Sequence, residues 1–161
     1  MNRILLVCGV TALLVGGCSA RSSGAPTSVC NDPLMEPTYH IDNFAATGVN
    51  NTNEYTLTSE PVVGSPGLFK VTLSGPVFKG YTVRATTTNA KNLGEFIADA
   101  NASEFQVMHC ASEKDVAVTH ASATDKSSVT LFWLDRNNGN YVLQATVVPD
   151  INTYVTLIYE Q

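Results

Sequence analysis

The sequence has no run of lysine or arginine anywhere along its length. Of its 161 residues, 9 are basic and 14 are acidic, which gives a formal net charge of −5. Proteins that bind nucleic acids or heparin-like chains normally carry a clustered basic patch. The composition therefore disfavours both classes of partner, and we expect no nucleic-acid-binding function.

Long hydrophobic stretches are also scarce, and the single one lies at the N-terminus. Residues 4–17 carry no charge, follow Arg3 and precede the small residues Ser19 and Ala20. A bilayer span needs about 20 apolar residues, so this stretch is too short. The order of basic, apolar and small residues is typical of a secretory signal peptide. We expect a leader over residues 1–20, a single mature domain over 21–161, no membrane span and an extracellular location.

A second interpretation of the leader stays open. Val15-Gly16-Gly17-Cys18 resembles a bacterial lipoprotein box. In that case Cys18 would carry lipid and would become the first residue of the mature protein.

Cysteine is rare, with four in the whole chain. Cys8 and Cys18 lie in the leader, so cleavage after Ala20 leaves Cys30 and Cys110. One cysteine pair in an oxidising compartment indicates one disulfide. We therefore predict a bond between Cys30 and Cys110.

Motifs for catalysis and metal binding are missing as well. There is no glycine-rich phosphate loop and no Gly-x-Ser-x-Gly turn to present a nucleophilic serine. The spacing of His40, His109 and His120 matches none of the usual zinc-ligand pairs. His109 and Cys110 are neighbours on a predicted strand, so they point to opposite faces. The sequence predicts a protein that is not an enzyme and that holds neither metal nor cofactor.

The chain does show a clear pattern: apolar and polar residues alternate with a period of two. Threonine and valine, which strands favour, are abundant throughout. Short strands separated by turn residues predict an all-β, antiparallel β-sandwich. The predicted strands cover residues 55–58, 68–73, 80–87, 104–110, 115–120, 128–134, 141–148 and 151–160.

The connections between these strands follow from their turn residues. Ser74-Gly75-Pro76 is expected to end one strand, and 89–103 to be a polar loop region with a short turn at Phe96-Ile97. The Asn-Gly step at 138–139 predicts a hairpin that pairs 141–148 with 128–134. Residues 21–29 are expected to form a loose arm. Trp133, on one strand face with two apolar neighbours, is expected in the core.

Two sequons, Asn50-Asn51-Thr52 and Asn101-Ala102-Ser103, lie in predicted loops. An N-glycosylation acceptor needs such a surface position in a secreted protein. Asn50 and Asn101 are therefore candidate glycosylation sites.

The order of short motifs resembles the Reeler (reelin-type) domain of animal extracellular proteins. The resemblance covers residues 24–158 and implies an immunoglobulin-like β-sandwich. It is carried by Gly24-Ala25-Pro26, Cys30, Val71-Thr72-Leu73-Ser74-Gly75, Phe78-Lys79-Gly80-Tyr81, Val107-Met108-His109-Cys110, Leu131-Phe132-Trp133 and Ala145-Thr146-Val147-Val148.

A Reeler domain behind a signal peptide is similar to secreted insect defence proteins. The resemblance implies an innate-immune, antibacterial protein that binds microbial surface polysaccharides or lipids and interacts with blood cells. An extracellular-matrix or adhesion module without an immune role is the alternative, and the lipoprotein is a third. The ligand-contacting residues stay unknown, although the polar stretches 42–54 and 86–103 offer amides and hydroxyls suited to sugars.

Overall fold

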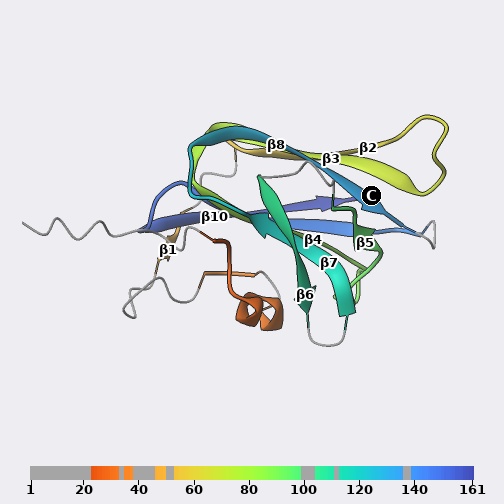
Figure 1. Ribbon diagram of the computed structural model, residues 1–161, viewed down its shortest axis with the longest axis horizontal. Coiled ribbons are helices and arrows are strands. Elements are labelled where there is room, and N and C mark those ends of the chain that lie inside the picture. Colours follow the sequence, from red (N-terminus) through yellow and green to blue (C-terminus); the bar gives the residue numbers. More distant parts are fainter. Residues whose placement is uncertain are drawn as a thin grey trace, which may run out of the picture.

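The computed structural model describes residues 23–32, 35–37, 46–49, 53–98, 104–110, 113–135 and 139–161. Within these ranges the chain forms strands in two layers and one short 3-10 helix (Figure 1). In chain order the elements are η1 (Thr27–Asn31), β1 (Thr47–Gly48), β2 (Thr56–Pro61), β3 (Leu68–Phe78), β4 (Gly80–Thr86), β5 (Glu95–Phe96), β6 (Phe105–Cys110), β7 (Glu113–His120), β8 (Lys126–Leu134), β9 (Val142–Val148) and β10 (Thr153–Glu160).

The strands form a six-stranded and a four-stranded sheet that face each other. The larger sheet has the order β1-β10-β9-β4-β7-β6 and the smaller one β2-β3-β8-β5. Every pairing is antiparallel except that of β1 with β10, which is parallel. The predicted all-β, immunoglobulin-like sandwich is confirmed.

The main core lies between the two sheets and is built from the alternating apolar positions. Val129, Leu131 and Trp133 of β8 are 4%, 1% and 0% exposed, so the prediction that they share a buried face is confirmed. Opposite them, Tyr81, Val83 and the rest of the inner face of β4 are equally buried. Burial of such side chains contributes about 1.5–3 kcal/mol each relative to an exposed position.

The outer face of the six-stranded sheet is buried too, which the alternation did not predict. Thr82, Arg84 and Thr86 of β4 point away from the core and are nevertheless 5%, 4% and 1% exposed. A second hydrophobic cluster covers this side of the sheet, formed by Val29, Met35, Met108, Cys110, Val116 and Ala117. Two of its members precede β1, so the N-terminal segment forms a third layer.

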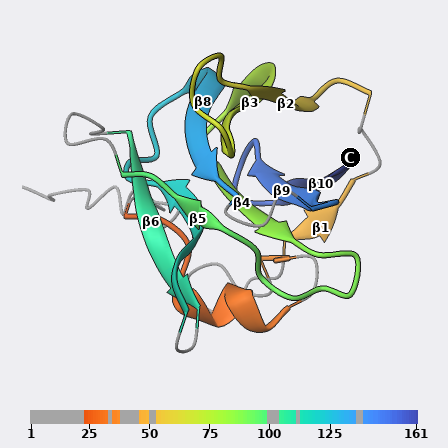
Figure 2. The same ribbon diagram turned by 90° about the vertical axis from the view of Figure 1, so that its right-hand side faces the viewer.

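We call residues 23–32 and 35–37 the strap. Figures 1 and 2 place its helix, η1, on the side of the six-stranded sheet that faces away from β2, β3 and β8. Gly24 has a φ of +93°, and a Cβ atom there would lie 2.7 Å from the carbonyl oxygen of His120. Only glycine permits this backbone conformation and this approach at low cost. The expectation of a loose arm is wrong for the described residues 23–29, because they pack closely on β6 and β7.

Polar contacts and one covalent bond hold the strap in place. The backbone N–H of Ala25 donates to Thr119 Oγ1 at 3.0 Å, and the Gln106 amide donates to the Ser23 carbonyl. Burial lowers the pKa of the Arg84 guanidinium, and the nearby Asp32 of the strap opposes that shift. These contacts attach the strap to strands β4, β6 and β7.

The disulfide expected from the sequence joins Cys30 of η1 to Cys110 at the end of β6. Their Cα atoms are 5.5 Å apart across a sequence separation of 80 residues. The bond therefore connects the strap to the edge strand of the larger sheet.

The predicted hairpin between 128–134 and 141–148 is wrong. β8 pairs with β3 and β5 in the smaller sheet, whereas β9 pairs with β4 and β10 in the larger one. The connection around Gly139 thus crosses from one sheet to the other. An Asn-Gly step favours a tight turn, but a turn does not decide whether the flanking strands pair with each other.

Three smaller differences concern segments read as loops. β3 continues through Ser74-Gly75-Pro76 with a register shift between Ser74 and Phe78, instead of ending there. Residues Glu95–Phe96 form β5 beside β8, inside the expected loop 89–103. Thr47–Gly48 form β1 in the polar stretch 42–54. β1 and β5 have two residues each and are stabilised by pairing with β10 and β8, not by an apolar pattern of their own.

One buried side chain gives a clear prediction about stability. The Tyr81 hydroxyl is buried and has no hydrogen-bond partner among the described residues, and burial, with a smaller effect of Glu104, raises the pKa of its phenol above 10.0. A buried unpaired hydroxyl costs about 1–3 kcal/mol. We expect Tyr81→Phe to leave the free energy of unfolding unchanged or to raise it by about 1 kcal/mol in urea titrations.

Tyr141→Phe is the matched control for this prediction. The Tyr141 ring is 2% exposed, and its hydroxyl is hydrogen-bonded to Ser59 Oγ at 2.9 Å and to the Gln161 side chain. Removing a paired hydroxyl should lower the free energy of unfolding by about 1 kcal/mol. A loss at Tyr81 as large as that at Tyr141 would contradict the assignment of an unpaired hydroxyl.

Candidate binding surface

The outer face of the four-stranded sheet carries hydroxyl groups in register. In β2, β3 and β8 the buried residues alternate with outward ones, and the pairing of the three strands aligns the outward ones in rows. One row consists of Thr56, Ser74 and Ser128, and the next of Thr58, Thr72 and Thr130. Paired strands lie about 4.8 Å apart, and alternate residues along a strand about 7 Å apart. The face therefore presents a grid of six hydroxyls.

We call the three rows together the hydroxyl face; its third row carries charged and aromatic side chains in place of hydroxyls. It contains Glu60, Lys70 and Phe132, which are aligned across the same strands. Lys70 Nζ lies 3.6 Å from Glu60 Oε2, so the two charges are paired. Phe132 is 38% exposed, and the N–H of Ile97, itself 41% exposed, donates to the Phe132 carbonyl at 2.9 Å. An aromatic ring and an aliphatic side chain thus lie beside the hydroxyls.

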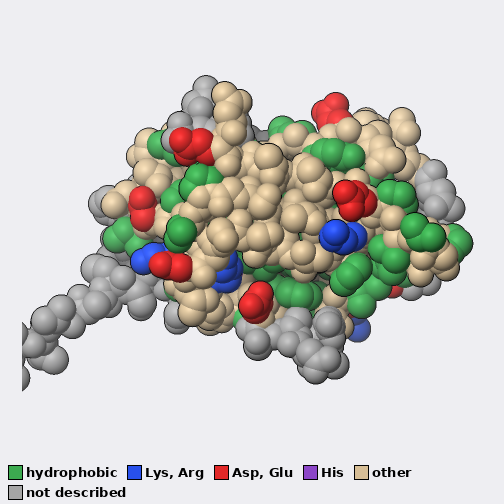
Figure 3. All heavy atoms as spheres, turned by 90° about the horizontal axis from the view of Figure 1, so that it is seen from above, with side chains coloured by type: hydrophobic (Ala, Val, Ile, Leu, Met, Phe, Trp, Pro, Cys, Tyr) green, Lys and Arg blue, Asp and Glu red, His purple; other side chains and the backbone are tan. Residues whose placement is uncertain are grey.

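Figure 3 looks onto this side of the molecule. Its middle is occupied by backbone and by side chains that are neither hydrophobic nor charged, and the acidic and basic groups are scattered. Ser and Thr hydroxyls both donate and accept hydrogen bonds. The chemistry available here is uncharged hydrogen bonding next to an exposed ring.

A groove borders the hydroxyl face along the edge strand β2. It has a volume of about 390 Å³ and lies between β2 and β10, with Thr56, Thr58 and Thr156 among its lining residues. The Thr156 hydroxyl itself is buried in register with Thr146 and Thr82, on the outer face of the six-stranded sheet, and has no hydrogen-bond partner among the described residues. Thr56 and Thr58 belong to the groove and to the face, so the two surfaces are continuous.

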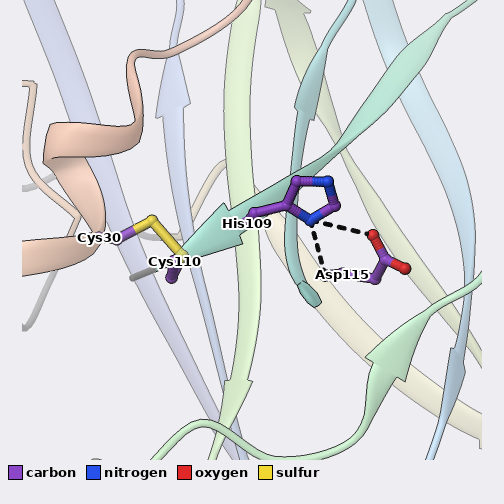
Figure 4. A network of polar contacts seen from close by, with 4 residues as sticks. All are labelled: Cys30, His109, Cys110 and Asp115. Atoms are coloured by element: carbon purple, nitrogen blue, oxygen red, sulfur yellow. Dashed lines mark hydrogen bonds and ion pairs between the residues drawn. A yellow bond between two sulfur atoms is a disulfide. The ribbon is translucent and has the colours of Figure 1, made fainter. Parts of the chain in front are cut away.

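His109 and Asp115 form a separate pair next to the disulfide (Figure 4). His109 Nδ1 lies 3.3 Å from Asp115 Oδ1 and also accepts the Asp115 backbone N–H at 3.3 Å. The pairing of β6 and β7 is irregular between Met108 and Cys110, and Asp115 has a φ of +57°. The contact stabilises this irregular end of the hairpin. Cys110 is bonded to Cys30 and offers no thiolate for catalysis.

The two described histidines, His109 and His120, have different surroundings. His120 is 8% exposed, and its Nδ1 accepts the Tyr81 backbone N–H at 3.2 Å, whereas His109 lies on the surface. His40 lies outside the described residues. Among the residues that the structure describes, no group of three or more potential ligands could hold a metal ion. The same ranges contain no helix long and apolar enough to span a membrane.

The predicted glycosylation sites Asn50 and Asn101 lie outside the described residues. So do parts of the two polar stretches proposed to contact sugars, namely 42–45, 50–52 and 99–103. Of the described part of 86–103, Leu93 and Phe96 are buried and belong to the core. Part of that stretch therefore packs in the core and is not available as a ligand-binding loop.

The sequence left the ligand-contacting residues unknown, named only the polar stretches 42–54 and 86–103 as suited to sugars, and did not single out the hydroxyl face. The signal was partly present, since Thr56 and Thr58, and Ser128 and Thr130, occupy alternate positions of predicted strands, and Thr72 lies on the strand predicted over 68–73. The alternation shows only that they point outward. Their alignment into rows depends on which strands pair and in which register.

Comparison with known proteins identifies the domain. The Reeler domain family model matches residues 28–160, which is more than half of the chain. No curated protein matches the sequence.

Two solved structures are similar in fold. The human F-spondin reeler domain is 24% identical with a TM-score of 0.55, and the match covers 72% of this chain and 94% of that domain. The Reelin-N domain of F-spondin is 26% identical with a TM-score of 0.54, covering 72% of this chain and 91% of the other.

Proposed function

This chain belongs to the Reeler domain family, an extracellular-matrix-type module, and we propose that it is a secreted, non-catalytic protein of innate defence that binds polysaccharides of microbial surfaces. The proposal includes removal of a leader over residues 1–20 and a mature domain over 21–161. It also includes N-glycans at Asn50 and Asn101. Secretion is supported by the disulfide between Cys30 and Cys110, because such bonds persist in oxidising compartments.

The hydroxyl face is the observation that carries the binding function. It is exposed, it lies on paired strands and not on a mobile loop, and its six hydroxyls are aligned across β2, β3 and β8. A site on regular strands is held more accurately than a site on loops. Hydroxyls without charge suit a polyhydroxylated ligand better than an anionic one, which agrees with the absence of a basic cluster in the sequence.

Binding to whole bacteria tests this proposal. We expect the purified mature protein to sediment with bacterial cells and to stay bound when the salt concentration rises from about 0.1 M to about 1 M. Screened electrostatic contacts weaken over this range, whereas uncharged hydrogen bonds and apolar contacts persist. The measurement is a pull-down quantified on gels, with serum albumin as the protein control.

Two results would contradict the proposal. Release of the protein by modest salt would indicate nonspecific charge attraction. Failure to bind any microbial surface, together with adhesion to animal cells or matrix, would favour an adhesion module without an immune role.

A further inference from the structure

We infer that the hydroxyl face and the adjoining groove form one site for an uncharged, extended glycan, with Phe132 as its stacking platform. This inference rests on the proposed function and names the ligand class and the residues that contact it. It places the ligand across β2, β3 and β8, on the sheet itself. The ligand would contact the face of the sheet and not the loops at the ends of the sandwich.

The charge of the face selects a neutral ligand. The three rows hold nine residues, of which only Glu60 and Lys70 are charged. Lys70 Nζ lies 3.6 Å from Glu60 Oε2, so the two charges are paired and the nine residues carry no net charge. Glu95 lies on β5, one row beyond Phe132, opposite Leu134. An anionic polysaccharide would meet no unpaired cation in the three rows and would approach a protein of net charge −5.

The middle row supplies hydroxyls that are free to bind. Thr56 and Ser74 of the first row bond to each other at 2.8 Å. The side-chain hydroxyls of Thr58, Thr72 and Thr130 make no hydrogen bond to any described residue. Because they cross three strands, they span about 10 Å. That length exceeds one sugar ring, so the ligand is an oligosaccharide or polysaccharide.

Phe132 supplies the apolar part of the site. The carbon-bound hydrogens of a sugar ring form an apolar surface that packs on an aromatic ring, and such burial adds affinity without charge. Phe132 follows Thr130 by two residues on β8, so both side chains lie on the same face, and Ile97 extends the apolar area. A ring stacked on Phe132 has its own hydroxyls next to Thr130.

The groove at the opposite end extends the hydroxyl face past the edge strand β2. Thr58 connects the groove to the middle row. A glycan chain that crosses the face along the middle row would continue into the groove at Thr58.

The test compares variants of the full mature protein in binding to a soluble neutral glucan, a soluble mannan and polygalacturonate. The triple variant Thr58→Val, Thr72→Val, Thr130→Val removes the middle row of hydroxyls and keeps residues that favour strands. We expect its Kd for the neutral polymer to rise about tenfold or more, at about two- to tenfold per hydroxyl. Phe132→Ala should raise the Kd by up to about tenfold.

Matched controls separate loss of the site from loss of the fold. Thr47→Val removes an exposed strand threonine from the other sheet, and Val63→Ala trims an apolar side chain that is 99% exposed in the β2–β3 connection. Both should leave the Kd unchanged. All variants should keep the thermal midpoint and the Trp133 fluorescence of the wild type, since each altered side chain lies outside the core.

The outcomes distinguish this inference from the proposed function. If the wild type binds bacteria and the triple variant and Phe132→Ala bind neutral glycans equally well, the inference is overturned and the proposed function stands. Binding of polygalacturonate alone, abolished by salt, overturns the inference as well. If the wild type binds no microbial cell and no glycan, both fail.

Discussion

Replacing Cys30 and Cys110 together by alanine should lower the free energy of unfolding by up to roughly 4–5 kcal/mol. The disulfide closes a loop of 80 residues, and the loss of chain entropy that this loop imposes on the unfolded state grows with its length. Alanine avoids placing a new polar group at Cys110, which is 4% exposed. Urea unfolding monitored by circular dichroism, with the oxidised wild type alongside, measures the effect.

Reduction of the wild type serves as the control, because it breaks the same bond without any substitution. Its unfolding curve should move toward that of the double variant. We expect faster hydrogen exchange at strap amides such as Ala25, whose N–H donates to Thr119 Oγ1, while the buried Trp133 keeps its emission. Equal unfolding midpoints for the oxidised and reduced proteins would show that the bond does not stabilise the fold.

Trp133→Ala should cost about 3–5 kcal/mol of unfolding free energy. The side chain is 0% exposed, and its ring lies 5.4 Å from that of Phe69 and 4.7 Å from that of Tyr141. The indole Nε1–H donates to the Leu93 carbonyl at 3.0 Å, so truncation removes apolar contacts and leaves a buried acceptor unpaired. Circular dichroism in urea measures the change, because the variant has no tryptophan emission.

Phe132→Ala, one residue away, is the matched control for that variant. Its side chain points outward and is 38% exposed, so the loss of stability should be well below that at Trp133. In the wild type, the Trp133 emission should be blue-shifted and resist iodide quenching. Strong quenching of the native protein would mean that the tryptophan is accessible, contrary to its position between the sheets.

The environment of Trp133 also shows what a local pattern leaves out. Gly94 has a φ of +65°, and a Cβ atom there would lie 2.6 Å from Trp133 Nε1. In the sequence, Gly94 reads as one more turn residue in a polar loop. Its role depends on a strand that lies about 40 positions later in the chain, and only the folded structure brings the two together.

Features that depend on neighbouring residues were determined by the sequence itself. Side chains alternate between the two faces of a strand, so the pattern at Val129, Leu131 and Trp133 identified a buried face without knowledge of the fold. The scarcity of cysteine left Cys30 and Cys110 as the pair, and the joint order of short motifs indicated the Reeler domain.

The tertiary structure decided which strands share a sheet, in which register, and what covers each face. Sheet hydrogen bonds join residues far apart in the chain, so β8 and β9 lie in different sheets despite the Asn-Gly step between them in the sequence. The same pairing aligned Thr58, Thr72 and Thr130 into a row. It also left the outer face of β4 to be buried by the strap. A period of two shows that a residue points outward, but whether it then meets water or another layer depends on contacts that no local pattern contains.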